Sequence, residues 1–203
     1  MIDFLMISTR STKRGVIEIY PKFIIKKSSD LMIRGGDFYA IWIEERGLWS
    51  TDEQDALQLI DRELDRYAEE SRQRFDSEIK VLHMWDAESG MIDSWHKYCQ
   101  KQMRDSFHML DDKLIFSNTK TDKKDYASKK LKYPLEAGDL SAYDQLMSTL
   151  YSEAERQKIE WAIGSVVCGE SEKLQKFMVL YGAAGTGKST VLNIIQQLFE
   201  GYY

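Results

Sequence analysis

The stretch Gly182-Ala-Ala-Gly-Thr-Gly-Lys-Ser-Thr190 fits the pattern G-x-x-x-x-G-K-[ST] of the phosphate-binding P-loop. In that motif backbone N–H groups surround phosphate oxygens, the lysine reaches the β and γ phosphates, and the Ser or Thr hydroxyl helps to hold Mg²⁺. The apolar run Phe177 to Tyr181 before the loop predicts a short buried strand. Apolar residues at helical spacing after it predict a helix from Val191 to Phe199.

The predicted nucleotide site consists of the loop and the first residues of its helix: Gly182, Ala183, Ala184, Gly185, Thr186, Gly187, Lys188, Ser189 and Thr190. Glycines allow positive φ and a close approach of the backbone to an anion. The helix that begins at about Gly187 directs its free N–H groups and its positive dipole end to the same place. Lys188 adds a full charge and is the predicted catalytic residue, and Ser189 is the predicted Mg²⁺ ligand. The alternative is a glycine-rich turn that binds nothing.

A working P-loop ATPase needs more than this unit. It requires an acidic residue at the end of another strand, to hold Mg²⁺ and orient water, and the other strands of a parallel sheet. The residues after Ser189 are taken up by the predicted helix, and the segment before Lys176 is predicted to be helical. We therefore expect residues 176–203 to be the incomplete start of an α/β ATPase domain in a longer protein, inactive in hydrolysis when alone.

Composition sets broad limits on the protein. The chain has 203 residues, of which 43% are hydrophobic and 30% charged, as is ordinary for globular proteins. A formal net charge of −5 argues against a surface that binds polyanions everywhere but allows a local basic patch. Cys99 and Cys168 lack metal-ligand spacing, which favours a reduced intracellular protein. His83, His96 and His108 form no cluster and are expected to be packed or solvated.

No targeting segment is predicted. The N-terminal residues are too short and too acidic for a signal peptide. No apolar run approaches the ~20 residues that cross a bilayer, so we expect no membrane association.

Residues 1–49 are predicted to be a β-rich part with one small sheet. Strands are expected at 4–7, 16–20, 23–25, 31–33, 38–43 and 47–49, with turns at 8–15 and 35–36 and a strand edge or bend at Pro21. Its aromatic residues interleave with Lys13, Arg14, Lys26, Lys27 and Arg34. Such a composition can stack bases and hold a phosphate backbone. It equally suits a small β core with solvated basic turns.

Residues 50–110 are predicted to be helical. A capping box at Ser50-Thr-Asp-Glu53 predicts a helix start, followed by an apolar stripe of Ala56, Leu57, Ile60, Leu64, Tyr67 and Ala68. A second helix is expected from Ser89 or Met91 to about Phe107, with Met91, Ile92, Trp95, Cys99 and Met103 on its core side.

Residues 111–175 are predicted to be a linker and a helical collar. Helices are expected at 140–150 and from the capping box Ser152-Glu-Ala-Glu155 to Gly169. A lysine cluster precedes them, formed by Lys120, Lys123, Lys124, Lys129, Lys130 and Lys132. This cluster suits either contact with DNA phosphates or a solvated linker, and Asp122 and Asp125 dilute its charge.

The stretch from about Asp111 to Tyr203 resembles the helical region and Walker A motif of the phage and poxvirus primase-helicases, whose motor belongs to helicase superfamily 3. The features that carry the resemblance are Ser117-Asn-Thr119, Tyr133-Pro134, Glu160-Trp-Ala-Ile-Gly164, Lys176-Phe177, the loop from Gly182 to Thr190, and Gly201-Tyr202. The part before Asp111 looks similar to the region that precedes the helical segment in phage members.

This resemblance implies an ATP-dependent DNA helicase of phage or prophage DNA replication in the cytoplasm of a bacterial host. It implies a homo-oligomeric ring, usually a hexamer, around single-stranded or forked DNA, with ATP and Mg²⁺ as cofactors. The glycines of the loop, Lys188, Ser189 and Thr190 would carry the family's nucleotide-binding roles. The family's Walker B acidic pair, polar sensor and arginine finger would fall beyond Tyr203, and primase chemistry has no identified counterpart.

The predicted fold class is therefore α+β: a small β-rich N-terminal part, a helical middle, and the first strand–P-loop–helix unit of a truncated α/β ATPase domain. Two other functions fit the same motif. One is another P-loop or AAA+ ATPase with an adaptor in front of it. The other is a non-enzymatic DNA-binding or interaction module whose P-loop is vestigial.

Overall fold

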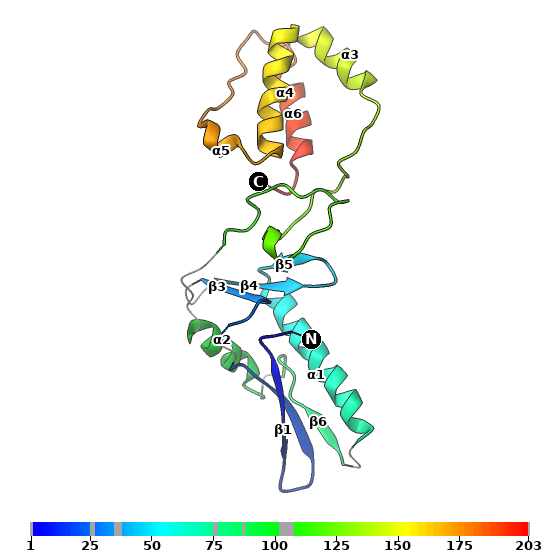
Figure 1. Cartoon of the computed structure of the whole chain (residues 1–203), viewed down its shortest axis with the longest axis vertical. Coiled ribbons are helices and arrows are strands. Elements are labelled where there is room, and N and C mark those ends of the chain that lie inside the picture. The colour runs from blue at the N-terminus through cyan, green and yellow to red at the C-terminus, as the bar shows by residue number, and fades with distance from the viewer. Residues whose placement is uncertain are drawn as a thin grey trace. The chain divides into compact units, whose positions relative to one another are not determined.

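The computed structural model describes residues 2–24, 27–34, 38–74, 77–86, 88–101 and 108–202, without the side chains of Arg34 and Phe38. The fold is mixed α+β, with small sheets and six α-helices in the described part (Figure 1). The chain divides into two compact units, unit 1 (Met1–Met109) and unit 2 (Leu110–Tyr203). Within the described ranges, no helix combines the length and apolar character needed to cross a bilayer.

Unit 1 contains two three-stranded sheets where the sequence predicted one. The first has the order β1-β2-β6, in which β1 (Met6–Ser11) is antiparallel and β6 (Ile79–Val81) parallel to β2 (Ile17–Lys22). The second is the antiparallel sheet of β3 (Leu31–Arg34), β4 (Phe38–Ile43) and β5 (Leu48–Ser50). The strands expected at 31–33, 38–43 and 47–49 are confirmed within one residue, whereas β6 was not predicted. The turn expected at 35–36 lies outside the described residues.

The first hairpin differs from the prediction. Residues 8–11, expected to be a turn, continue strand β1, and the turn is confined to the residues after Ser11. Their polar side chains are compatible with pairing because one face of the strand points away from the core. Pro21 lies within β2 opposite Ile7, beyond the part of β2 that pairs with β6, so its missing N–H breaks no bond to that strand.

The strand expected at 23–25 is wrong for the described residues Phe23 and Ile24, which lie outside any strand. The ring of Phe23 instead packs 5.1 Å from that of Trp95, centroid to centroid. Ile25 lies outside the described residues.

Helix α1 (Glu53–Arg72) begins two residues later than the predicted capping box requires. Its N-cap is Asp52, whose side chain accepts a hydrogen bond from the Gln54 N–H at 2.9 Å. Ser50 belongs to β5, and its hydroxyl lies 3.1 Å from the backbone nitrogen of Asp52, from which it accepts a hydrogen bond. The apolar stripe is confirmed, since Ala56, Leu57, Ile60, Leu64 and Ala68 are buried and Tyr67 packs, partly buried, against the same core.

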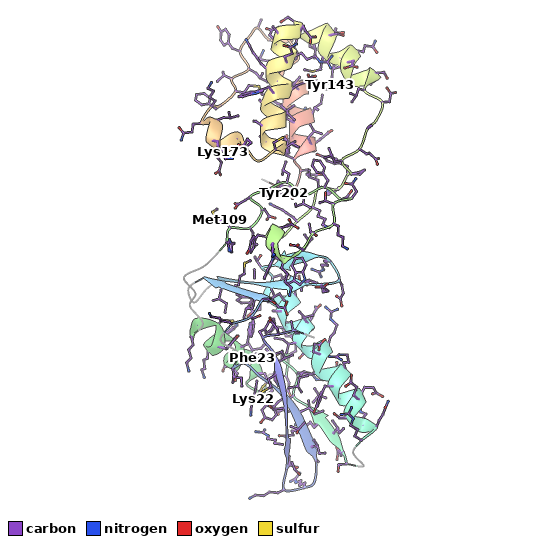
Figure 2. The ribbon with its side chains drawn as sticks, in the orientation of Figure 1. Lys22, Phe23, Met109, Tyr143, Lys173 and Tyr202 are labelled. Atoms are coloured by element: carbon purple, nitrogen blue, oxygen red, sulfur yellow. The ribbon has the colours of Figure 1, made fainter. Side chains whose placement is uncertain are left out.

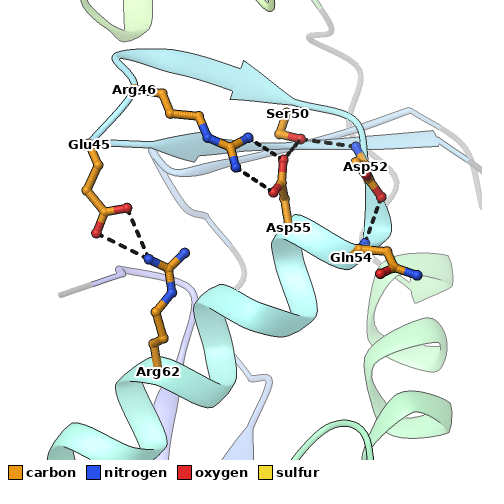
Figure 3. Close-up of polar contacts among 7 residues, drawn as sticks. All are labelled: Glu45, Arg46, Ser50, Asp52, Gln54, Asp55 and Arg62. Atoms are coloured by element: carbon orange, nitrogen blue, oxygen red, sulfur yellow. Dashed lines mark hydrogen bonds and ion pairs between the residues drawn. The ribbon is translucent and has the colours of Figure 1, made fainter.

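An ion pair links the start of α1 to the turn between β4 and β5 (Figure 3). Both terminal nitrogens of Arg46 bind the Asp55 carboxylate, at 2.7 and 2.9 Å, and the Ser50 hydroxyl donates to it at 2.6 Å. The Arg46 guanidinium, aided by Ser50, lowers the pKa of Asp55. The stability that this carboxylate adds is therefore present at neutral pH and is lost as the pH falls through the lowered pKa.

The core of unit 1 is centred on helix α2 (Met91–Lys101), which buries Trp95, Tyr98 and Cys99. Trp95 is fully buried and its ring lies within 6 Å, centroid to centroid, of Phe4, Phe23, Tyr39 and Tyr98. The predicted helix after Lys101, with Met103, lies outside the described residues.

We expect the two cysteines to react very differently with a thiol reagent. Cys99 is only 3% exposed, and burial raises its pKa to about 12, so at pH 8 it is almost entirely protonated and inaccessible. Cys168 is exposed. The native chain should therefore incorporate one equivalent of iodoacetamide at pH 8, mapped to Cys168 by peptide mass spectrometry. A second equivalent should enter only in denaturant, and equal labelling of both native thiols would contradict this burial.

Unit 2 is built on three helices around a small apolar cluster. Helices α3 (Ser141–Leu150), α4 (Glu153–Val167) and α6 (Lys188–Leu198) bury Met147, Ile159 and Val191 against one another, and the short α5 (Ser171–Leu174) follows α4. The capping box predicted for α4 is confirmed, because Glu155 Oε2 accepts from both the backbone N–H and the hydroxyl of Ser152, at 2.8 and 2.7 Å.

The segment before these helices is held by the end of the chain. Residues 111–140 are irregular apart from one turn of 3-10 helix, η1 (Lys123–Asp125). The Tyr202 hydroxyl accepts a hydrogen bond from the Ile115 N–H at 3.0 Å and donates one to the Lys129 carbonyl at 2.9 Å (Figure 2). The segment has no regular secondary structure, and hydrogen bonds to Tyr202, which follows α6, help to hold it in place.

Candidate nucleotide-binding site

The predicted P-loop forms a glycine-rich turn that leads directly into helix α6. Gly185 and Gly187 have φ angles of +79° and +75°, in the left-handed region that other residues avoid. Gly187 is the N-cap of α6 and has no side chain with which to satisfy the free N–H groups of the first turn. These N–H groups and the positive end of the helix dipole therefore remain available to an anion.

Lys188, the first residue of α6, turns its side chain back over the loop. Its Nζ donates to the carbonyl oxygens of Gly182 and Ala183 at 3.0 and 2.5 Å, and lies 2.9 Å from Thr186 Oγ1. The same hydroxyl donates to the Ala183 carbonyl at 3.0 Å. The ammonium group of Lys188 therefore lies against the loop and is hydrogen-bonded to two of its backbone carbonyl oxygens.

The segment before the loop is not the buried strand that the sequence predicts. Residues 176–181 pair with no strand among the described residues. Phe177, Val179 and Tyr181 are 88%, 69% and 98% exposed, while Leu180 is partly buried against the cluster formed by α3, α4 and α6. The physical reason is that a strand requires a hydrogen-bonded neighbour, and in unit 2 the described residues offer helices and irregular chain to this segment.

Helix α3 contacts the loop, which the sequence did not predict. A methyl group built on Gly187 would lie 2.6 Å from Leu150 Cδ1 and 2.7 Å from its Cδ2. The last residue of α3 therefore touches the N-cap of α6. No sequence signal marks this contact, because Leu150 is only one of several apolar residues at a helix end.

A cavity of about 360 Å³ opens beside the loop. Its walls come from the end of α3, from α4, from the segment before the loop and from the loop itself, and include Tyr151, Glu155, Lys158, Leu180, Gly182 and Lys188. The buried hydroxyl of Tyr151 finds no hydrogen-bond partner in the described part of the chain. The cavity therefore offers both charged and apolar surface next to the predicted phosphate site.

Gly182 lies close to Thr186 and Lys188 in the loop. A Cβ built on Gly182 would come 3.4 Å from Thr186 Oγ1 and 3.8 Å from Lys188 Nζ, so a side chain there would fill the hollow in front of the lysine. The exposed hydroxyl of Ser189 lies in the first turn of α6 and could contribute one oxygen to Mg²⁺. Within the described ranges, no three His, Cys, Asp or Glu side chains are grouped to hold a metal ion.

Several of the histidines and lysines considered in the sequence analysis have local partners. His83 and His96 pair with Asp65 and Glu53 at 2.7 and 2.5 Å. Three of the clustered lysines also contact their own unit. Lys130 donates to the Thr119 carbonyl at 2.9 Å, Lys132 pairs with Glu200 at 3.0 Å, and Lys129 lies 4.7 Å from the centroid of the Tyr202 ring.

Comparisons of the chain with protein-family models, with curated proteins and with solved structures find no match.

Proposed function

We propose that this chain carries the nucleotide-binding start of an ATP-driven DNA helicase of the primase-helicase type. The observation that carries the proposal is the loop from Gly182 to Thr190, in which left-handed glycines, the N-terminus of α6 and Lys188 converge on one hollow. Hydrolysis of ATP bound there would supply the free energy that drives the helicase. Backbone N–H groups at the start of α6 would hold phosphate oxygens, Lys188 would balance their charge, and Ser189 would contribute an oxygen to Mg²⁺.

The segment before the loop also supports this proposal. Phe177 to Tyr181 is apolar and largely exposed, and its backbone pairs with no strand in the described ranges. In a P-loop ATPase the segment in this position is a strand of a parallel sheet whose other strands carry the acidic Mg²⁺ ligand. Hydrolysis, unwinding and ring assembly therefore belong, in this proposal, to a protein that provides those strands.

Nucleotide binding by the chain itself tests the proposal. Titration with a fluorescent ATP analogue and Mg²⁺ should show saturable binding, and Lys188→Ala should weaken it by at least about tenfold because a charge-assisted contact to phosphate is lost. Lys173→Ala is the matched control, since Lys173 is an exposed lysine of α5 that pairs with Glu170 at 2.8 Å and lies outside the loop. Equal affinity of Lys188→Ala and wild type would refute the assignment.

A second candidate is an interaction module whose loop binds no nucleotide. One observation favours it: the amine of Lys188 already has three partners inside the loop. An ATP analogue must displace these contacts to bind. The absence of saturable binding to the wild-type chain at millimolar nucleotide would favour this candidate over the helicase.

A further inference from the structure

The β1-β2-β6 sheet has one face against the core and one face in solvent. In the pairing of β1 with β2, Ile7 and Ile19 belong to the inner set, and they pack with Val81 of β6 in the core of unit 1. Side chains alternate along a strand, so the neighbouring residues point outward. The outward set consists of Met6, Ser8, Arg10, Glu18, Tyr20, Lys22 and Lys80. We call this set the outer face.

An aromatic ring lies in the middle of the outer face with a cation on either side. Tyr20 is directly opposite Ser8, whose small side chain leaves space beside the ring. Arg10 Cζ lies 5.3 Å and Lys22 Nζ 5.7 Å from the centroid of the Tyr20 ring (Lys22 is labelled in Figure 2). By register the backbone positions of Arg10 and Lys22 are about 13 Å apart along the strands, one on each side of Tyr20, and both side chains reach back over its ring.

The outer face is basic in a chain that is acidic overall. Its basic residues, together with those of the adjoining hairpin turn, are Arg10, Lys13, Arg14, Lys22 and Lys80. All of them are exposed. The acidic residues at or beside the face are Glu18, which pairs with Arg10 at 2.6 Å, and Glu78. Because the formal net charge of the chain is −5, this excess of positive charge is a local feature.

From this arrangement we propose that the outer face binds single-stranded DNA, with a base stacked on Tyr20 and phosphates held by the basic residues on both sides of it. Binders of single strands combine an exposed aromatic ring with a positively charged track, because every base has a π-face and every nucleotide a phosphate. A duplex hides the faces of its bases, so this platform favours unpaired strands. The choice of DNA over RNA rests on the proposed helicase function. The site itself shares no residue with the P-loop.

The test uses the whole chain without nucleotide and measures fluorescence anisotropy of a labelled oligothymidylate at low salt. Tyr20→Ala should weaken binding by about tenfold, which is the scale of one stacked base. Tyr20→Leu should weaken it equally while keeping apolar bulk, and Tyr20→Phe should bind as wild type because the ring remains. Circular dichroism of each variant checks that the sheet is intact.

The salt dependence tests the cations separately. Lys22→Gln should reduce the slope of log affinity against log salt by about 0.7, the value for one phosphate contact to a single strand. Arg72→Gln is the matched control, because Arg72 is 58% exposed on α1, which covers the opposite side of the sheet, and pairs with Glu69. Its slope should equal that of wild type.

Several results would overturn the proposal: no binding by wild type, an unchanged affinity of both Tyr20→Ala and Tyr20→Leu, or a duplex bound as tightly as the single strand. Tighter binding of oligouridylate would overturn the choice of DNA. Lys188→Ala should bind the oligonucleotide as wild type does. Failure of the P-loop assignment and failure of the DNA site are thus seen in different measurements.

Discussion

Replacing Trp95 by alanine should lower the free energy of unfolding of unit 1 by about 3–5 kcal/mol, the usual cost of removing a large buried aromatic side chain. Trp95 is fully buried, and its ring contacts come from the N-terminal segment, from the residue after β2, from β4 and from α2. The cavity left by the indole borders all of these segments, so the surrounding chain cannot collapse into it without moving several of them.

The burial of Cys99 gives a direct measure of this effect. In a Cys168→Ser background, the rate at which Cys99 reacts with a thiol reagent at increasing urea reports the opening of unit 1. Trp85→Ala is the matched control, because Trp85 is 52% exposed and its loss should change the stability by less than about 0.5 kcal/mol. A Trp95→Ala variant as stable as the Trp85→Ala control would show that Trp95 is not the centre of this core.

Local sequence signals predicted the elements whose stabilising contacts are local. The apolar stripe of α1 and the capping box at Ser152 are patterns within a few residues, and both are confirmed. The start of α1 was misplaced because Ser50 and Asp52 both have side chains that suit an N-cap. The pairing of Ser50 with Ile41 in the sheet, together with its contact to Asp55, leaves Asp52 as the cap.

Elements that depend on distant partners were not predictable in this way. Strand β6 has only three residues and forms by pairing with Ile17–Ile19, far earlier in the chain. Conversely, Phe177 to Tyr181 has the composition of a buried strand, but a strand forms only where another one supplies its hydrogen bonds. The nine residues of the loop could be named from a motif, since the motif encodes backbone geometry. The contact of Leu150 with Gly187 could not be predicted from any motif.

The contact between Leu150 and Gly187 underlies the second large effect, which we expect from Gly187→Ala. The substitution should destabilise α6 by about 2–5 kcal/mol through two separate costs. Alanine at a φ of +75° costs roughly 1–2 kcal/mol of backbone strain. Its methyl group would also lie 2.6 Å from Leu150 Cδ1, and overpacking of this kind costs about 1–3 kcal/mol. Hydrogen exchange of α6 peptides, followed by mass spectrometry, measures the sum.

Two further variants separate these costs and so test whether α3 holds the loop. Gly185 has a similar φ of +79°, and a methyl group placed on it would meet no described atom within 4 Å, so Gly185→Ala should show the strain alone. In the double variant Gly187→Ala with Leu150→Ala the clash is gone, and the destabilisation should fall short of the sum of the single changes by about 1–3 kcal/mol. Strict additivity would mean that α3 does not touch the loop in solution. A measured coupling would mean that any movement of α3 changes the N-cap of α6, and with it the position of the N–H groups and of Lys188 on which phosphate binding depends.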